Sequence, residues 1–176
     1  IIIPELIALK ESKEYSIKGK LNTKNITLNK NEIKNLINDK FSELNIEEIS
    51  FSSKNNFKFK INKNFKIKNL DIKSKIDLEK FKLNNFLKLK DVFPKIKNDF
   101  IFKDHKIKLQ YKKDNLNING EGEVSLQNED DVIKYEINKR KKDFKFDTTL
   151  NISKNYFKKD LLNFEKKENS NLKLNL

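Results

Sequence analysis

The sequence predicts a mainly β protein, built on an antiparallel curved sheet that is groove-like and open or half-open, with one or two short helices. Three observations lead to this prediction. Apolar and polar residues alternate with a period of two along most of the 176 residues. Short polar clusters rich in Asn, Lys and acidic residues separate the alternating stretches, as turns do in a meander. With 36% hydrophobic and 37% charged residues, each strand can bury one face and expose the other.

The first 41 residues predict a hairpin followed by a helix. Ile7 and Leu9 precede a polar turn at 10–14, after which alternation resumes. The alternating residues of the second strand are Tyr15, Ile17, Gly19 and Leu21, and Ile26 and Leu28 continue as a short strand. Asn29 or Asn31 is suited to cap the helix that follows. One face of this helix would carry Ile33, Leu36, Ile37 and Phe41. We interpret it as a packing helix over one end of the sheet, and the alternative is an amphipathic helix at a membrane surface.

The middle of the chain continues the strand pattern. We expect turns at 55–56 and 62–64, and a β-bulge where the alternation changes phase at Asn69 and Leu70. Residues 84–93 predict a second helix, which Pro94 ends. The apolar residues of the middle strands are Ile46, Ile49, Phe51, Phe57, Phe59, Ile61, Phe65, Ile67, Leu70, Ile72, Ile76 and Leu78.

The last part of the chain predicts an almost pure meander. Its expected turns lie at 103–106, 112–115, 127–131 and 139–143, and Gly120 and Gly122 interrupt one strand. A less regular stretch at 155–171 precedes a final strand. The apolar residues of these strands are Phe100, Phe102, Ile107, Leu109, Tyr111, Leu116, Ile118, Val124, Leu126, Ile133, Tyr135, Ile137, Phe144, Phe146, Leu150 and Ile152.

The net charge of +13 has two interpretations. It can attract an anionic partner such as nucleic acid or an acidic membrane surface. It can also follow from AT-rich codons, which favour Lys, Asn, Ile and Phe, and we favour this second interpretation. Arg140 is the sole arginine. Because bidentate recognition of bases and phosphates favours Arg over Lys, the sequence does not favour specific nucleic-acid binding.

No constellation of residues predicts catalysis, and we expect neither an enzyme nor a cofactor. His105 is the sole histidine, and we interpret it as a solvated turn residue. Glu129, Asp130 and Asp131 lack calcium-loop spacing and predict a hairpin turn. Cys is absent, which excludes thiolate metal sites and a cysteine nucleophile, and we expect no metal site.

Residues 1–176 are expected to be a single segment of a longer repetitive β-sheet protein, with both ends truncated. The chain starts at Ile1 without an initiator Met, and it ends within a strand pattern at 172–176. No apolar run approaches the roughly 20 residues that cross a bilayer, so any anchor would lie outside this segment.

Three stretches of repeated strand pattern carry a family resemblance. They are YSIKGKLN at 15–22, FKIKNLDIKSKIDL at 65–78, and IKLQY at 107–111 leading into LNINGEG at 116–122. With them, the region from 15 to about 152 resembles the AsmA-like bacterial envelope proteins, the group that includes the TamB and YhdP types. The resemblance implies a long β-groove in the periplasm, anchored in the inner membrane through a region outside this segment. It also implies phospholipid transport between the inner and outer membranes, in support of outer-membrane biogenesis.

The expected partners are phospholipid acyl chains and neighbouring β segments of the same polypeptide. The lipid-groove candidates are Phe57, Phe59, Ile61, Phe65, Ile67, Ile107, Leu109, Tyr111, Phe144 and Phe146. Alternation alone does not separate an open groove from a closed sandwich. The alternative function is a basic polyanion-binding or nucleic-acid-binding β module, and a third possibility is a scaffold that carries no lipid. Strand alternation places Phe and Lys on opposite faces, which disfavours the nucleic-acid alternative.

Overall fold

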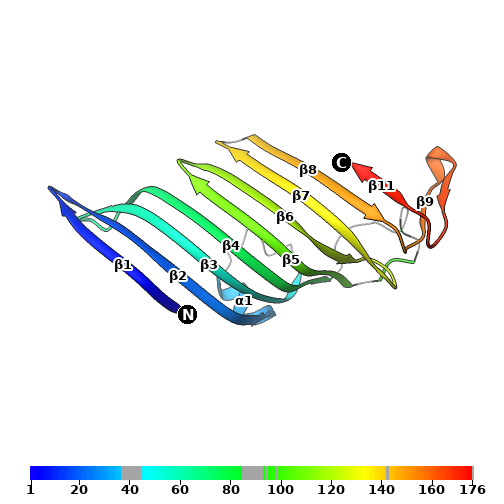
Figure 1. The fold of residues 1–176 in the computed structure, drawn as a ribbon, viewed down its shortest axis with the longest axis horizontal. Coiled ribbons are helices and arrows are strands. Elements are labelled where there is room, and N and C mark those ends of the chain that lie inside the picture. The colour runs from blue at the N-terminus through cyan, green and yellow to red at the C-terminus, as the bar shows by residue number, and fades with distance from the viewer. Residues whose placement is uncertain (37–44, 85–92, 94, 98, 142, 176) are drawn as a thin grey trace.

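The structure is a computed structural model that describes residues 1–36, 45–84, 93, 95–97, 99–141 and 143–175. Nine strands form one antiparallel sheet in the order β1-β2-β3-β4-β5-β6-β7-β8-β11 (Figure 1). Their bounds are β1 Ile2–Glu11, β2 Glu14–Asn29, β3 Ile46–Asn62, β4 Ile67–Asn84, β5 Asp99–Lys112, β6 Asn115–Ser125, β7 Asp130–Arg140, β8 Asp143–Ile152 and β11 Leu172–Asn175. The sheet is open, with β1 and β11 at its two edges, so the predicted fold class is confirmed.

The remaining elements are small. Strands β9 (Phe157–Lys159) and β10 (Phe164–Lys166) form a separate two-stranded sheet, joined by the 3₁₀ turn η2 (Asp160–Leu162). Figure 1 shows this hairpin beside β11, at the far end of the main sheet from β1.

The predicted first helix is confirmed as α1 (Lys30–Leu36). Asn29 caps it, because its Oδ1 accepts hydrogen bonds from the backbone N–H groups of Asn31 (3.0 Å) and Glu32 (3.2 Å). The Glu32 carboxylate accepts a bond from the Asn29 N–H in return (2.9 Å), which completes a capping box. Ile33 is buried where the helix contacts β2 and β3. In the described part of the chain, no helix has the length and apolar character that crossing a bilayer requires.

Two helix predictions fall partly on residues outside the described ones. These are the extension of the first helix over 37–41 and most of the second helix at 84–93. At its ends, Asn84 is the last residue of β4 and Phe93 is buried in the core. The predicted phase change at Asn69 is confirmed, because the pairing of β3 with β4 shifts between Lys58 and Lys60 and Asn69 has a positive φ of 53°.

Two predicted turns are wrong. Asn55 and Asn56 lie inside β3, where the Asn55 side chain donates to the Leu21 carbonyl (2.9 Å) and the Ser53 hydroxyl (2.8 Å). These bonds use the Asn55 side-chain N–H groups across the sheet, whereas an Asn side chain that bonds its own local backbone favours a turn. Residues 103–106 lie inside β5, where Asp104 takes a positive φ of 51° and the pairing with β6 shifts. The polar cluster there makes a bulge instead of a turn.

The two ends of the sheet differ in their connections. The short turns β1/β2, β3/β4, β5/β6 and β7/β8 all lie at one end, called here the turn end (Figure 1). Helix α1 lies at the other end. The hydrophobic core sits near this second end, where Phe93, Val124, Leu126, Leu150, Ile152 and Phe157 form one buried cluster.

Candidate binding face of the sheet

The strand registers bring most apolar residues of β3–β8 onto one face of the sheet, whereas Ile7 and Leu9 of β1 lie opposite Lys18 and Ser16 on the other face. Residues directly opposite each other on antiparallel strands point to the same side. One row of partners crosses six strands, and a neighbouring row crosses four. The first row is Phe57, Ile72, Tyr111, Leu116, Lys139 and Phe144, and the second is Leu109, Ile118, Ile137 and Phe146. We call this side the apolar face.

Nine of the ten predicted groove residues lie in strands that contribute to the apolar face. Three come from β3, one from β4, three from β5 and two from β8. Phe57 and Phe59 stack with ring centroids 6.0 Å apart. Ile61 pairs directly with Ile67. Phe65 is the exception, because it lies in the β3/β4 turn with a positive φ of 56° and is 84% exposed.

Burial along the apolar face changes from one end of the strands to the other. At the turn end Phe144 is 66% exposed and Phe146 is 58% exposed. Four residues further along the same strand, Leu150 is only 8% exposed because it belongs to the core cluster. In the middle of the face, Leu109 and Ile107 are half-buried. Among the described residues, the apolar face is therefore most accessible near the turns.

The interpretation of His105 as a solvated turn residue is wrong. It lies in β5 and is 1% exposed, directly opposite Leu78 and against the rings of Phe102 (5.3 Å between centroids) and Tyr135 (5.7 Å). His105 continues the alternation of Ile107 and Leu109 on the apolar face, and the bulge at Asp104 brings Phe102 onto the same face. Gly122 makes room for the ring, since a Cβ there would lie 2.3 Å from His105 Cδ2.

The protonation state of His105 follows from its surroundings. Burial lowers the pKa of the imidazole below its ordinary value of 6.5, against the opposing effects of its bond to the Glu123 carbonyl and of Asp104. Since a carbonyl only accepts, His105 Nε2 carries the proton and donates to Glu123 O (2.8 Å). Nδ1 is then a buried acceptor, with no hydrogen-bond partner among the described residues. Burial also raises the pKa of the neighbouring Tyr135 to about 12.

A few polar groups interrupt the apolar face. The hydroxyls of Thr23 and Ser53 bond to each other (2.9 Å), and Ser74 is buried in the next row position. Thr148, directly opposite Tyr135, has a buried hydroxyl for which the described part of the chain offers no hydrogen-bond partner. These groups lie between the exposed turn end and the covered core, so the apolar face is not uniformly hydrocarbon-like.

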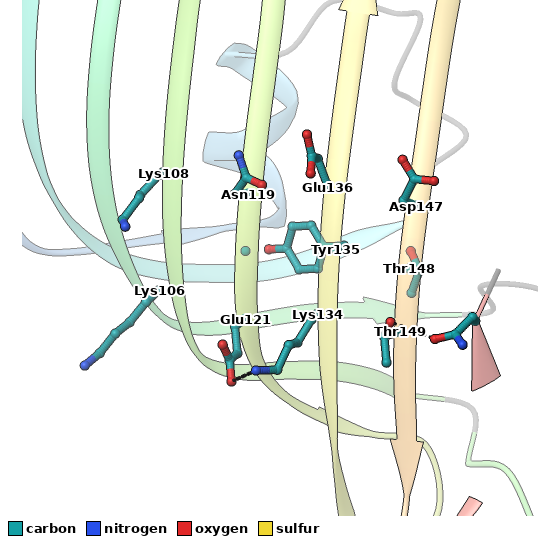
Figure 2. Close-up of a pocket in the computed structure, with 12 residues that line it drawn as sticks. Lys106, Lys108, Asn119, Glu121, Lys134, Tyr135, Glu136, Asp147, Thr148 and Thr149 are labelled. Carbon is teal, nitrogen blue, oxygen red and sulfur yellow. Dashed lines mark hydrogen bonds and ion pairs between the residues drawn. The ribbon is translucent and has the colours of Figure 1, made fainter. Parts of the chain in front are cut away.

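The opposite side of the sheet is the polar face, and it carries most of the charge. Figure 2 shows its part over β6–β8, where acidic and basic side chains mix around a hollow of about 630 Å³. There Lys134 pairs with Glu121 (2.8 Å), and Glu136 and Asp147 lie close by. A second hollow of about 650 Å³ lies over β2–β5, and it is lined by lysines and amides. Sequence reasoning treated this face only as a solvated surface.

A buried polar network near the C-terminus was also missed. Asp131, 1% exposed, accepts bonds from the backbone N–H groups of Ser153 (2.9 Å) and Lys154 (3.2 Å) and from the Asn155 amide (2.7 Å). Lys166 is buried too, and its ammonium donates to the Asn155 carbonyl (2.6 Å). Asp131 is therefore a structural residue of β7 rather than part of a solvated turn. Within the described ranges, no group of three or more His, Asp and Glu could hold a metal ion.

Comparisons with known proteins identified no relative of this chain. Neither the family models, nor the curated proteins, nor the solved structures contain a match to this chain.

Proposed function

We propose that this chain is a non-enzymatic segment of an AsmA-like envelope protein, a structural β-groove that binds phospholipid acyl chains on its apolar face. It would support phospholipid transport between the inner and outer membranes, in the periplasm, in a parent protein anchored in the inner membrane. The observation that carries the proposal is the exposure of Phe144 and Phe146 at the turn end of the apolar face. Contiguous exposed apolar surface commonly marks a binding site for apolar ligands.

The chemistry of the apolar face fits acyl chains better than a polar substrate. Phe, Ile, Leu and Tyr side chains from adjacent strands offer apolar contact area to a hydrocarbon chain, and Lys139 interrupts the first row beside Phe144. Each CH₂ removed from water contributes about 0.8 kcal/mol, so an acyl chain of about 16 carbons gains at most about 12 kcal/mol when fully covered. An acyl chain that is only partly covered at the turn end would gain a fraction of that energy. Weaker binding of this kind suits a transport protein, which must also release the lipid.

The open sheet supports the same proposal. Its edges, β1 and β11, leave backbone groups free to pair with neighbouring β segments of the same polypeptide. A groove extended in this way would continue the apolar face from segment to segment.

Photocrosslinking tests the proposal. Benzophenone side chains placed at Phe146 and Leu109 on the apolar face, and at Lys145 and Lys108 on the polar face, would be irradiated with phospholipid vesicles. We expect phospholipid adducts from the first pair and none from the second. Equal labelling of both faces, or no adduct from either, would refute the lipid groove and leave a scaffold.

A further inference from the structure

The hollow over β2–β5 on the polar face, called here the lysine hollow, concentrates positive charge. Its volume of about 650 Å³ is lined by five lysines, six Asn or Gln residues, Ser74 and Leu109. The lysines are Lys20, Lys54, Lys73, Lys75 and Lys108, and the Asn and Gln residues are Asn22, Asn55, Asn56, Gln110, Asn117 and Asn119. Among the described residues that line it, none is acidic and none is aromatic. Its size is in the range of small-molecule sites.

Strand register forces three of these lysines together. Lys54 lies directly opposite Lys75, and Lys75 lies directly opposite Lys108 on the next strand. Like charges in directly opposed positions of an antiparallel sheet destabilise it. Adjacent strands are about 4.8 Å apart, so the three ammonium groups can converge on one ligand.

The lysines at the turn end of the same sheet are arranged differently. Lys60 pairs with Glu11 (2.6 Å), Lys68 with Glu14 (2.7 Å) and Lys112 with Asp71 (3.5 Å). Of the five in the lysine hollow, Lys20 pairs with Glu5 (2.6 Å), and the ion pairs among described residues include none of the other four. Those four are exposed, so their charges are available to a ligand.

We propose that the lysine hollow binds a compact ligand that carries several phosphate groups. Clustered ammonium groups supply the charge, and Asn22, Asn56 and Gln110 supply neutral N–H donors for phosphate oxygens. No aromatic ring is present there to stack a nucleobase, so the phosphates are recognised rather than a base. This site is on the opposite face from the proposed acyl-chain groove and does not depend on it.

Isothermal titration with inorganic tripolyphosphate at low salt tests the proposal, and inorganic monophosphate and citrate serve as comparison ligands. We expect saturable binding at one site, tighter for tripolyphosphate than for either comparison ligand. The double variant Lys75→Gln/Lys108→Gln should weaken it at least about tenfold, because two charge-assisted contacts are lost. The matched control is Lys18→Gln/Lys58→Gln. It removes two exposed lysines that face each other on the same face but outside the lysine hollow, and should change affinity less than about twofold.

Equal weakening by the two double variants would overturn the proposal, because it would show a general charge effect. Equal affinities for citrate and tripolyphosphate would also overturn it. A third contrary result would be duplex DNA that binds more tightly than tripolyphosphate and is weakened equally by the two double variants. A footprint on the unmodified chain gives a check that needs no variant. Tripolyphosphate should slow acetylation of Lys75 and Lys108 but leave Lys18 and Lys58 unchanged, and protection of all four alike would overturn the proposal.

Discussion

The change in burial along β8 gives a sharp test of where the core ends and the binding face begins. Phe146 and Leu150 lie on the same strand and the same face, four residues apart, yet they are 58% and 8% exposed. Truncating each to Ala should therefore separate folding from binding. Thr148 lies between them and stays unchanged in both variants.

The magnitudes follow from burial. Leu150→Ala removes a side chain from the core cluster and leaves a cavity, which should cost about 3 kcal/mol of unfolding free energy. Phe146 is less than half buried, so Phe146→Ala should cost about 1 kcal/mol. For a domain of this size each kcal/mol lowers Tm by about 3 °C, which predicts decreases of about 9 °C and about 3 °C.

The assays are thermal unfolding followed by circular dichroism, and binding of a fluorescent phospholipid at a temperature where both variants are folded. Phe146→Ala should weaken lipid binding about fivefold, the equivalent of about 1 kcal/mol of lost acyl contact. Leu150→Ala should leave it within about twofold of the unchanged chain. Equal losses of Tm would refute the assigned change in burial. Unchanged lipid binding by Phe146→Ala would refute the role of the turn end.

Three further predictions concern the interior. Gly122→Ala should destabilise the chain by about 3 kcal/mol in urea unfolding, because the new Cβ would lie 2.3 Å from His105 Cδ2 and 2.7 Å from His105 Cα. Adding His105→Ala should restore only part of this loss, since the contact with Cα stays; full restoration would contradict the geometry. The buried His105 binds a proton less readily folded than unfolded, so its contribution to stability should be complete above pH 6.5 and be lost as pH falls through its lowered pKa. Urea titrations between pH 4 and 8 should show this decrease, and the decrease should shrink in His105→Phe; an identical pH profile in both would refute it. Lys166→Met should cost about 2 kcal/mol, because the Asn155 carbonyl loses its donor. Lys167→Met, at an exposed neighbouring position, is the control and should be neutral; equal effects would show that the Lys166 ammonium is not a structural donor.

Local pattern was enough to predict much of the fold. Side chains of a strand alternate between faces, so the spacing of Phe57, Phe59 and Ile61 predicted both a strand and a shared apolar side. The cap residue Asn29 marked the start of α1, because a side-chain amide can bond the free N–H groups of a first helical turn. The phase change at Asn69 likewise marked a bulge. One extra residue in a strand moves every later side chain to the opposite face of the sheet.

The sequence alone determined the alternation, the presence of the first helix and the separation of apolar from charged side chains in most strands, because these depend on residues close together in the chain. Only the tertiary structure decided which strands pair and in what register, and three outcomes depend on that. Strand pairing buries His105 against Gly122 and Tyr135 from two other strands. Asp131 becomes a buried acceptor for groups more than 20 residues away. Lys54, Lys75 and Lys108 converge although they are distant in the chain, because pairing between strands, which no local pattern encodes, sets their distances.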